Sequence, residues 1–170
     1  MVLCAGAPDT PEIAAELRQK VDAARVHHPR IVWIEQMVTK EEAIQLYSHC
    51  SVFCCPSVYE PFGIINLEAM ACRAPVVASA TGGILEVVVD EETGHLVPFD
   101  ADPVTTFPKD PAKFAKDLAA RLTELLKDPA KAQRMGEAGR KRVEEHFSWT
   151  AIAAQTIKLY EGLIAGRAKA

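Results

Sequence analysis

The chain has 170 residues, of which 49% are hydrophobic and 25% charged, with a formal net charge of −4 at pH 7. This length suits one well-packed domain, and the acidic balance argues against a nucleic-acid partner, because phosphate-backbone binding needs a clear basic surplus. No apolar run approaches the roughly 20 residues that a bilayer-spanning helix needs, and no basic-then-apolar leader opens the chain. We therefore expect a cytoplasmic protein without a membrane span.

Short apolar runs alternate with helical segments along the chain. The first predicted strand is residues 2–5, and residues 9–11 offer a cap followed by proline, which predicts a helix to about residue 24. The second strand is residues 31–34. Thr39 and Glu42 have the spacing of a capping box and predict the start of a second helix.

The remaining strands are predicted at residues 51–55, 75–78 and 94–97. The remaining helices are predicted at residues 63–72, 84–89, 111–127, 130–147 and 148–165, the last capped by Ser148, with a surface loop at 98–108. Strands without polar alternation, separated by helices, indicate a parallel sheet that is covered on both faces. We expect an α/β fold with a Rossmann-like, doubly wound parallel sheet, formed as a single domain by residues 1–170.

Ligands of such folds bind outside the carboxyl ends of the strands. The loops at that edge contain Met37, residues 57–64 and residues 79–83. Glu60 precedes Pro61, which favours an extended backbone and keeps this glutamate in the loop. Its side chain is either a ligand of the bound molecule or a plain acidic loop residue.

Glu68 lies in a helix that is apolar on nearly all sides, where an ionised carboxylate is costly to bury unless it is paired. It either faces the cleft, where it accepts ribose hydroxyls, or forms a salt bridge on the helix surface. Gly63 and Ile64 add N–H groups at the start of this helix, where the positive end of the dipole favours anions.

Thr81, Gly82 and Gly83 repeat this arrangement after the next strand. A lone Gly-Gly pair is more often a turn than a phosphate cradle, but two such junctions beside two carboxylates point to an anionic, hydroxyl-rich ligand such as a nucleotide-sugar. No Cys–His pairing has zinc-ligand spacing. Of the histidines, only His95 is a candidate to lie near a ligand loop. We expect no metal site.

Residues 60–64 together with 67–71 resemble the Glu-x7-Glu signature of retaining glycosyltransferases with the GT-B fold. Residues 75–79 and 82–88 continue the match in the same order. The resemblance runs from Val2 to about Leu163 and is nearest to actinobacterial glycogen synthases that use ADP-glucose. It implies that the chain is the C-terminal, donor-nucleotide half of a GT-B enzyme.

The resemblance implies a role for each matching residue. Glu60 would approach the hydroxyls of the donor sugar as the catalytic residue, and Glu68 would hold the ribose of the nucleotide. The backbone of Phe62, Gly63 and Ile64 would contact the sugar and the diphosphate.

Thr81 and Gly82 would line the same pocket, and Met37 and Val38 would bind the base through main-chain groups. The implied reaction transfers glucose from a nucleotide-sugar, which is a substrate and not a cofactor, to a glucan end or a small acceptor with retained anomeric configuration. Its transition state would have oxocarbenium character, with charge building on the departing diphosphate.

The chain also departs from the family pattern. Family members carry an Arg and a Lys that neutralise the diphosphate, in a first strand–loop–helix unit, whereas Met1 to Cys4 corresponds to their second strand. This chain is therefore expected to lack the basic pair. It is also expected to lack the N-terminal acceptor domain, which would be its partner and would bind the glucan acceptor. Residues 148–165 would be the crossover helix to that domain, and the chain alone is expected to be inactive.

Two other classes of function remain open. The chain is alternatively a non-catalytic nucleotide-sugar binding module, or a structural or assembly domain with an exposed apolar surface that favours association. The sequence also leaves open ADP-sugar against UDP-sugar, a glucan acceptor against glucose 1-phosphate, and the oligomeric state.

Overall fold

The computed structural model describes residues 1–4, 6, 8 and 10–167. The chain divides into two compact units, Met1–Ala43 and Ile44–Ala170. The described strands form two parallel sheets, β1-β2 in the first unit and β3-β4-β5 in the second, where one sheet was predicted. Local patterns identify strands without specifying which strands pair. That the whole chain acts as one domain stays a prediction.

The first unit contains two short strands joined by a long helix. β1 (Val2–Cys4) pairs with β2 (Val32–Ile34), and α1 (Pro11–His27) connects them. The Ile13 N–H donates to the Thr10 hydroxyl at 3.3 Å, which confirms the predicted cap with proline at the first helical position. Ala5, the predicted end of the first strand, and Asp9, in the predicted cap, lie outside the described residues.

The capping box at the start of α2 (Lys40–His49) is confirmed. The Thr39 N–H donates to Glu42 Oε2 at 2.8 Å, and the Glu42 N–H donates to Thr39 Oγ1 at 3.2 Å. These reciprocal bonds satisfy two N–H groups that the helix itself leaves without acceptors.

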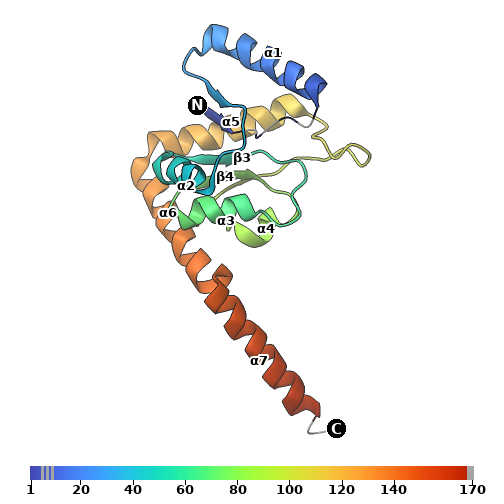
Figure 1. Cartoon of the computed structure of the whole chain (residues 1–170), viewed down its shortest axis with the longest axis vertical. Coiled ribbons are helices and arrows are strands. Elements are labelled where there is room, and N and C mark those ends of the chain that lie inside the picture. The colour runs from blue at the N-terminus through green and yellow to red at the C-terminus, as the bar shows by residue number, and fades with distance from the viewer. Residues whose placement is uncertain (5, 7, 9, 168–170) are drawn as a thin grey trace. The chain divides into compact units, whose positions relative to one another are not determined.

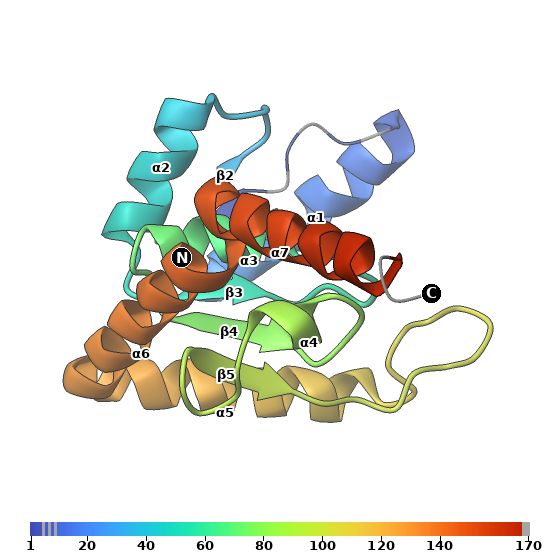
Figure 2. The ribbon, with the colours of Figure 1, turned by 90° about the horizontal axis from the view of Figure 1, so that it is seen from below.

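The second unit is built on a three-stranded sheet of β3 (Phe53–Cys55), β4 (Val76–Ser79) and β5 (Gly94–Val97), which Figure 2 shows side by side. All neighbouring strands are parallel. The helices α3 (Ile64–Ala71) and α4 (Ile84–Val87) follow β3 and β4, as the sequence predicted.

Helices cover both faces of this sheet, so the predicted fold class is confirmed (Figure 1). Along β4 the side chains alternate between two cores. Val76 and Ala78 belong to the core that contains Met70 of α3, whereas Val77 belongs to the core that contains Leu125 of α5 (Pro111–Lys127). All four residues of β4 are buried, which explains its continuous apolar run.

The C-terminal segment differs from its prediction in one respect. Residues 130–147 were expected to form one α-helix, but α6 (Pro129–Arg142) gives way to a π-helix, η1 (Val143–Phe147). The Ser148 hydroxyl then accepts the Ala151 N–H at 3.1 Å and caps α7 (Trp149–Arg167), as predicted.

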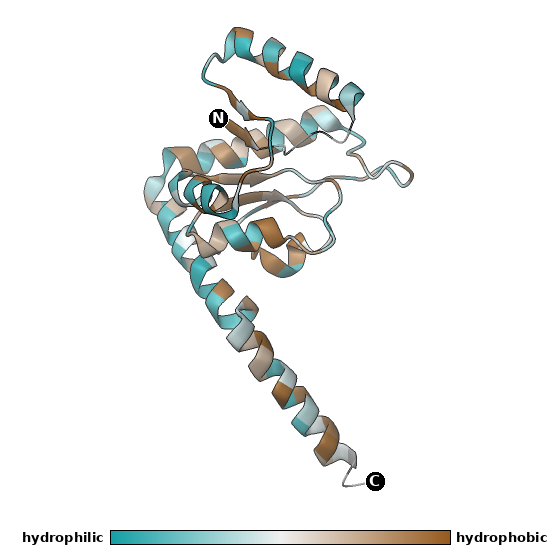
Figure 3. Ribbon diagram, in the orientation of Figure 1, coloured by the Kyte–Doolittle hydropathy of each residue, from teal (hydrophilic) through white to brown (hydrophobic). Residues whose placement is uncertain are grey.

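Apolar side chains of α7 are exposed to solvent. Hydrophobic residues, coloured brown in Figure 3, recur along this helix between hydrophilic ones. The most exposed of them are Trp149, Ile157, Leu159, Tyr160, Leu163 and Ile164. None of the helices in the described ranges combines the length and apolar character needed to cross a bilayer. The predicted contact of α7 with an acceptor domain stays a prediction.

Candidate functional site

The loops that follow β3 and β4 pack tightly against each other. The Gly83 N–H donates to the Glu60 carbonyl oxygen at 2.9 Å. A Cβ at Gly82 would overlap the Glu60 carbonyl oxygen, and a Cβ at Gly83 would overlap the Phe62 Cα. Gly82 also has a φ of +49°, in the left-handed region that favours glycine. The two glycines therefore allow the two predicted junctions to form one site.

Glu60 is half-buried at the start of α3, where its Oε1 accepts the Gly63 N–H at 3.1 Å. This bond fixes the carboxylate beside the positive end of the helix. The Gly63 N–H, which was expected to face an anionic ligand, is therefore occupied by a side chain from its own loop. A different set of N–H groups is open: those of Ile64, Ile65 and Gly82 have no acceptor among the residues that the structure describes.

Glu68 is exposed on α3, one helical turn after Ile64 and on the same face. The Tyr47 hydroxyl donates to Glu68 Oε2 at 3.4 Å, and the Tyr47 ring packs edge-on against Phe53 at 5.3 Å between centroids. No cationic side chain in the described part of the chain forms an ion pair with Glu68, so the alternative of a surface salt bridge is absent there. The carboxylate is accessible to a ligand, and its role stays a prediction.

Two buried polar side chains for which the sequence predicted no role support these loops. Asn66 is fully buried in α3, with its Nδ2 3.7 Å from Cys55 Sγ and 3.2 Å from the place where a Cβ at Gly63 would lie. Buried Ser79 donates to the Ser57 carbonyl oxygen and thereby joins the end of β4 to the loop after β3. An asparagine inside an apolar helix was the available signal, because a buried amide requires partners.

Met37 and Val38, the residues expected to contact the base, lie in the first unit between β2 and α2. Met37 is 77% exposed and Val38 is half-buried. The structure describes the two units separately, so their part in the site stays a prediction.

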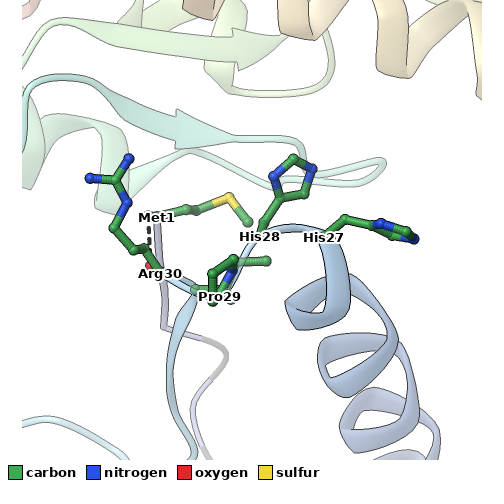
Figure 4. A pocket seen from close by; sticks show the side chains of 6 residues that line it. Met1, His27, His28, Pro29 and Arg30 are labelled. Atoms are coloured by element: carbon green, nitrogen blue, oxygen red, sulfur yellow. Dashed lines mark hydrogen bonds between the residues drawn. The ribbon is translucent and has the colours of Figure 1, made fainter.

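The first unit also has a pocket, lined by residues that include Met1, His27, His28 and Arg30 (Figure 4). The Met1 amino group donates to the Arg30 carbonyl oxygen at 3.4 Å, as the dashed line in Figure 4 marks. These residues immediately precede β1 and β2, at the amino ends of the strands. Ligands of parallel α/β sheets bind at the opposite edge, so this pocket is not the predicted site.

His95 on β5 is fully buried beside acidic side chains. Its Nδ1 lies 3.3 Å from Glu91 Oε1 and 3.9 Å from Asp90 Oδ1, and its Nε2 lies 3.6 Å from Glu124 Oε1. Neither ring nitrogen has a hydrogen-bond partner within residues 1–4, 6, 8 and 10–167. Asp90, Glu91 and His95 form the arrangement most similar to a metal-ligand set among these residues.

Two cations already form ion pairs with Glu91 and Glu124 in this cluster. Arg121 Nη1 lies 3.0 Å from Glu91 Oε1, and Lys131 Nζ lies 3.0 Å from Glu91 Oε2 and 2.5 Å from Glu124 Oε1. A divalent ion would have to displace them. The arrangement therefore suits an ion-pair network that joins β5 to the helices α5 and α6.

The free energy of unfolding is expected to depend on His95. Burial lowers the pKa of His95, against the opposing effect of Glu91 and Glu124. The unfolded chain, with a His pKa of about 6.5, then binds the proton more readily than the folded chain. Stability is therefore full above about pH 6.5 and falls as the pH drops through that value towards the lower folded pKa.

Urea unfolding of the wild-type protein and of His95→Gln between pH 5 and pH 8 tests this expectation. The variant should lose part of the acid-side decline, whereas His49→Gln, which changes an exposed histidine, should keep it. Parallel profiles for the wild-type protein and His95→Gln would contradict the prediction.

Comparison with known proteins identifies similar sequences over most of the chain. The family model described as "Glycosyl transferases group 1" matches residues 16–142. An alpha-maltose-1-phosphate synthase of Mycobacterium tuberculosis strain H37Rv is 47% identical over 165 residues, which is 97% of this chain and 41% of that protein. A glycogen synthase of the same organism is 35% identical over 157 residues, which is 89% of this chain and 34% of that protein.

Among solved structures, sucrose-phosphate synthase from Thermosynechococcus elongatus superposes with a TM-score of 0.72 and 38% identity, over 97% of this chain and 38% of that one. The chain thus spans 41% of the length of the maltose-1-phosphate synthase. The sequence pattern favoured glycogen synthases as the nearest relatives. Of the two mycobacterial enzymes, however, the maltose-1-phosphate synthase is the more similar.

Proposed function

The chain belongs to the group 1 glycosyl transferases and has the Rossmann-like fold of the C-terminal GT-B domain, and we propose that it binds the nucleotide-sugar donor. The observation that carries this proposal is the packing of Gly82 and Gly83 against Glu60 and Phe62. This packing gathers a carboxylate and open N–H groups at the carboxyl ends of neighbouring parallel strands. Such an edge suits a diphosphate that is linked to a sugar.

The proposed roles follow from the chemistry of each group. The open N–H groups of Ile64, Ile65 and Gly82 would donate to the diphosphate, as helix starts and turns do to anions. Glu60 would face the donor sugar, held in orientation by its bond to the Gly63 N–H. Glu68, the second acid of the proposed Glu-x7-Glu motif, would accept the ribose hydroxyls.

The proposed reaction breaks the bond between the anomeric carbon and the diphosphate and forms a bond to an acceptor hydroxyl, with retained configuration. The acceptor proton leaves with the diphosphate. Positive charge develops on the sugar and negative charge on the leaving group in the transition state. A carboxylate beside the sugar and N–H dipoles at the phosphate would stabilise both charges electrostatically. No metal or cofactor is part of this proposal.

The proposed donor is ADP-glucose, with UDP-glucose as the alternative. Maltose 1-phosphate is a glucose disaccharide with a phosphate, so its formation by glucosyl transfer requires glucose 1-phosphate as acceptor. The 47% identity to a maltose-1-phosphate synthase supports this acceptor, and the 35% identity to a glycogen synthase supports a glucan end as the second candidate. Both acceptors would bind to parts of the longer protein outside this chain.

Calorimetric titration of the chain with ADP, ADP-glucose and UDP-glucose tests the donor role. We expect ADP and ADP-glucose to bind and UDP-glucose to bind more weakly. Absence of binding by all three would overturn the donor role and favour an assembly domain, for which the exposed apolar side chains of α7 are the supporting observation.

A further inference from the structure

The helix α4 is held at both ends by distant parts of the chain. At its start, Gly83 packs against the Phe62 backbone. At its end, Arg142 of α6 donates through Nε to the Val87 carbonyl oxygen and through Nη2 to the Glu86 carbonyl oxygen, both at 2.8 Å. A helix of four residues is too short to be stable alone, so these contacts determine where it lies.

A ring contact connects the same arginine to the loop that contains Glu60. The Arg142 guanidinium carbon lies 5.5 Å from the centre of the Phe147 ring. That ring meets the Phe62 ring edge-on, with centroids 6.2 Å apart and an interplanar angle of 63°. Phe62 is therefore fixed from two sides, its backbone by Gly83 and its ring by Phe147.

The π-helix η1 explains why Arg142 and Phe147 act together. They are five residues apart, and five residues of an α-helix would turn them away from each other. The wider turn of a π-helix, with its i to i+5 hydrogen bonds, brings such a pair towards one side. Single π-helical turns in longer helices occur frequently at functional sites.

We propose that Arg142 and Phe147 are positioning residues of the donor site. They hold the end of α4 and the Phe62 ring, and so keep the Gly82–Gly83 turn and the Glu60 carboxylate in the arrangement that the donor requires. This inference rests on the proposed function. Their contacts are with α4 and with the Phe62 ring, so both act through these groups.

A purely structural role would affect stability and leave donor affinity unchanged, and Arg140 provides the matched control. Two residues before Arg142 on α6, its Nη1 donates to the Ala71 carbonyl oxygen at 2.6 Å. It therefore supports α3 through one hydrogen bond to a carbonyl group at the C-terminal end of the helix. Glu60 and Gly63 lie at the opposite end of α3. Arg140→Lys should cost stability in the same manner as Arg142→Lys.

The test measures the dissociation constant for ADP-glucose by calorimetry in the wild-type protein, Arg142→Lys, Phe147→Leu and Arg140→Lys. Amide exchange of residues 82–88 is followed in parallel, and thermal unfolding shows which variants fold. We expect the dissociation constant to rise about tenfold in Arg142→Lys and Phe147→Leu, with faster exchange at residues 82–88, because small displacements of binding groups are costly. Arg140→Lys should change neither quantity.

Each outcome is decisive. Wild-type binding with unchanged dissociation constants in Arg142→Lys and Phe147→Leu would overturn the positioning role and leave the donor role intact. An equal loss of affinity in Arg140→Lys would also overturn it, since any arginine that caps a helix would then have the effect. Failure of the wild-type protein to bind any of the nucleotides would overturn the proposed function and, with it, this inference.

Discussion

Glu68→Ala is expected to weaken the binding of ADP-glucose by about 1.5–3 kcal/mol, the range for hydrogen bonds to a charged group. The carboxylate is exposed on the face of α3 that carries Ile64, whose N–H is open, and no cation in the described residues pairs with it. Removal of the side chain should therefore remove the acceptor for the ribose hydroxyls while leaving the fold intact. Titration calorimetry of the variant with ADP and ADP-glucose measures the change.

Glu137→Ala is the matched control for this prediction. Glu137 is also an exposed helical glutamate, on α6, but its Oε2 forms an ion pair with Arg73 Nε at 3.1 Å. The control should bind ADP-glucose as the wild-type protein does. Tyr47→Phe should give a smaller loss than Glu68→Ala, because it removes only the hydroxyl that donates to the carboxylate. Equal affinities for Glu68→Ala and Glu137→Ala would rule out the ribose role.

Gly83→Ala is expected to lower the free energy of unfolding by about 1–3 kcal/mol, the typical cost of forcing atoms into a packed region. The added methyl group would overlap the Phe62 Cα and lie 2.6 Å from the Phe62 and Pro61 carbonyl oxygens. These are backbone atoms, which cannot move aside as a flexible side chain does. The loops after β3 and β4 must then separate, so ADP-glucose binding should be lost as well.

Urea unfolding and calorimetric titration measure both effects. Gly162→Ala is the control, because Gly162 lies in α7 and, apart from its own stretch of helix, no atom of the described residues lies within 4 Å of the added position. That substitution should leave binding unchanged and stabilise the helix by up to about 1 kcal/mol. Wild-type stability and affinity in Gly83→Ala would contradict the close packing of the two loops.

Short-range chemistry was enough to predict most elements of the fold. The capping box of Thr39 and Glu42 and the cap at Ser148 involve atoms only a few residues apart, so their sequence patterns specify the bonds that the structure contains. A continuous apolar run predicted the buried strand β4 for the same reason, because the hydrophobicity of each residue indicates whether that residue is buried. The π-helix was missed, since residues 143–147 carry no local pattern that distinguishes five-residue from four-residue hydrogen bonding.

The sequence likewise predicted some features of the candidate site and not others. Glu60, Gly82 and Gly83 could be assigned to one edge of the sheet, because parallel strands end there whatever the details of packing. That Glu60 accepts the Gly63 N–H, and that Gly83 lies against Phe62, depends on how two loops meet across neighbouring strands.

The contacts of Arg142 with Val87 and Glu86 could not be found from the sequence at all. They join residues 55 and 56 positions apart, and nothing near Arg142 in the chain indicates which carbonyl groups it will reach. Residue type and spacing thus determined the elements and the edge at which a ligand would bind. Only tertiary packing decided which side chains and N–H groups are held there, because long-range contacts depend on the arrangement of the whole unit.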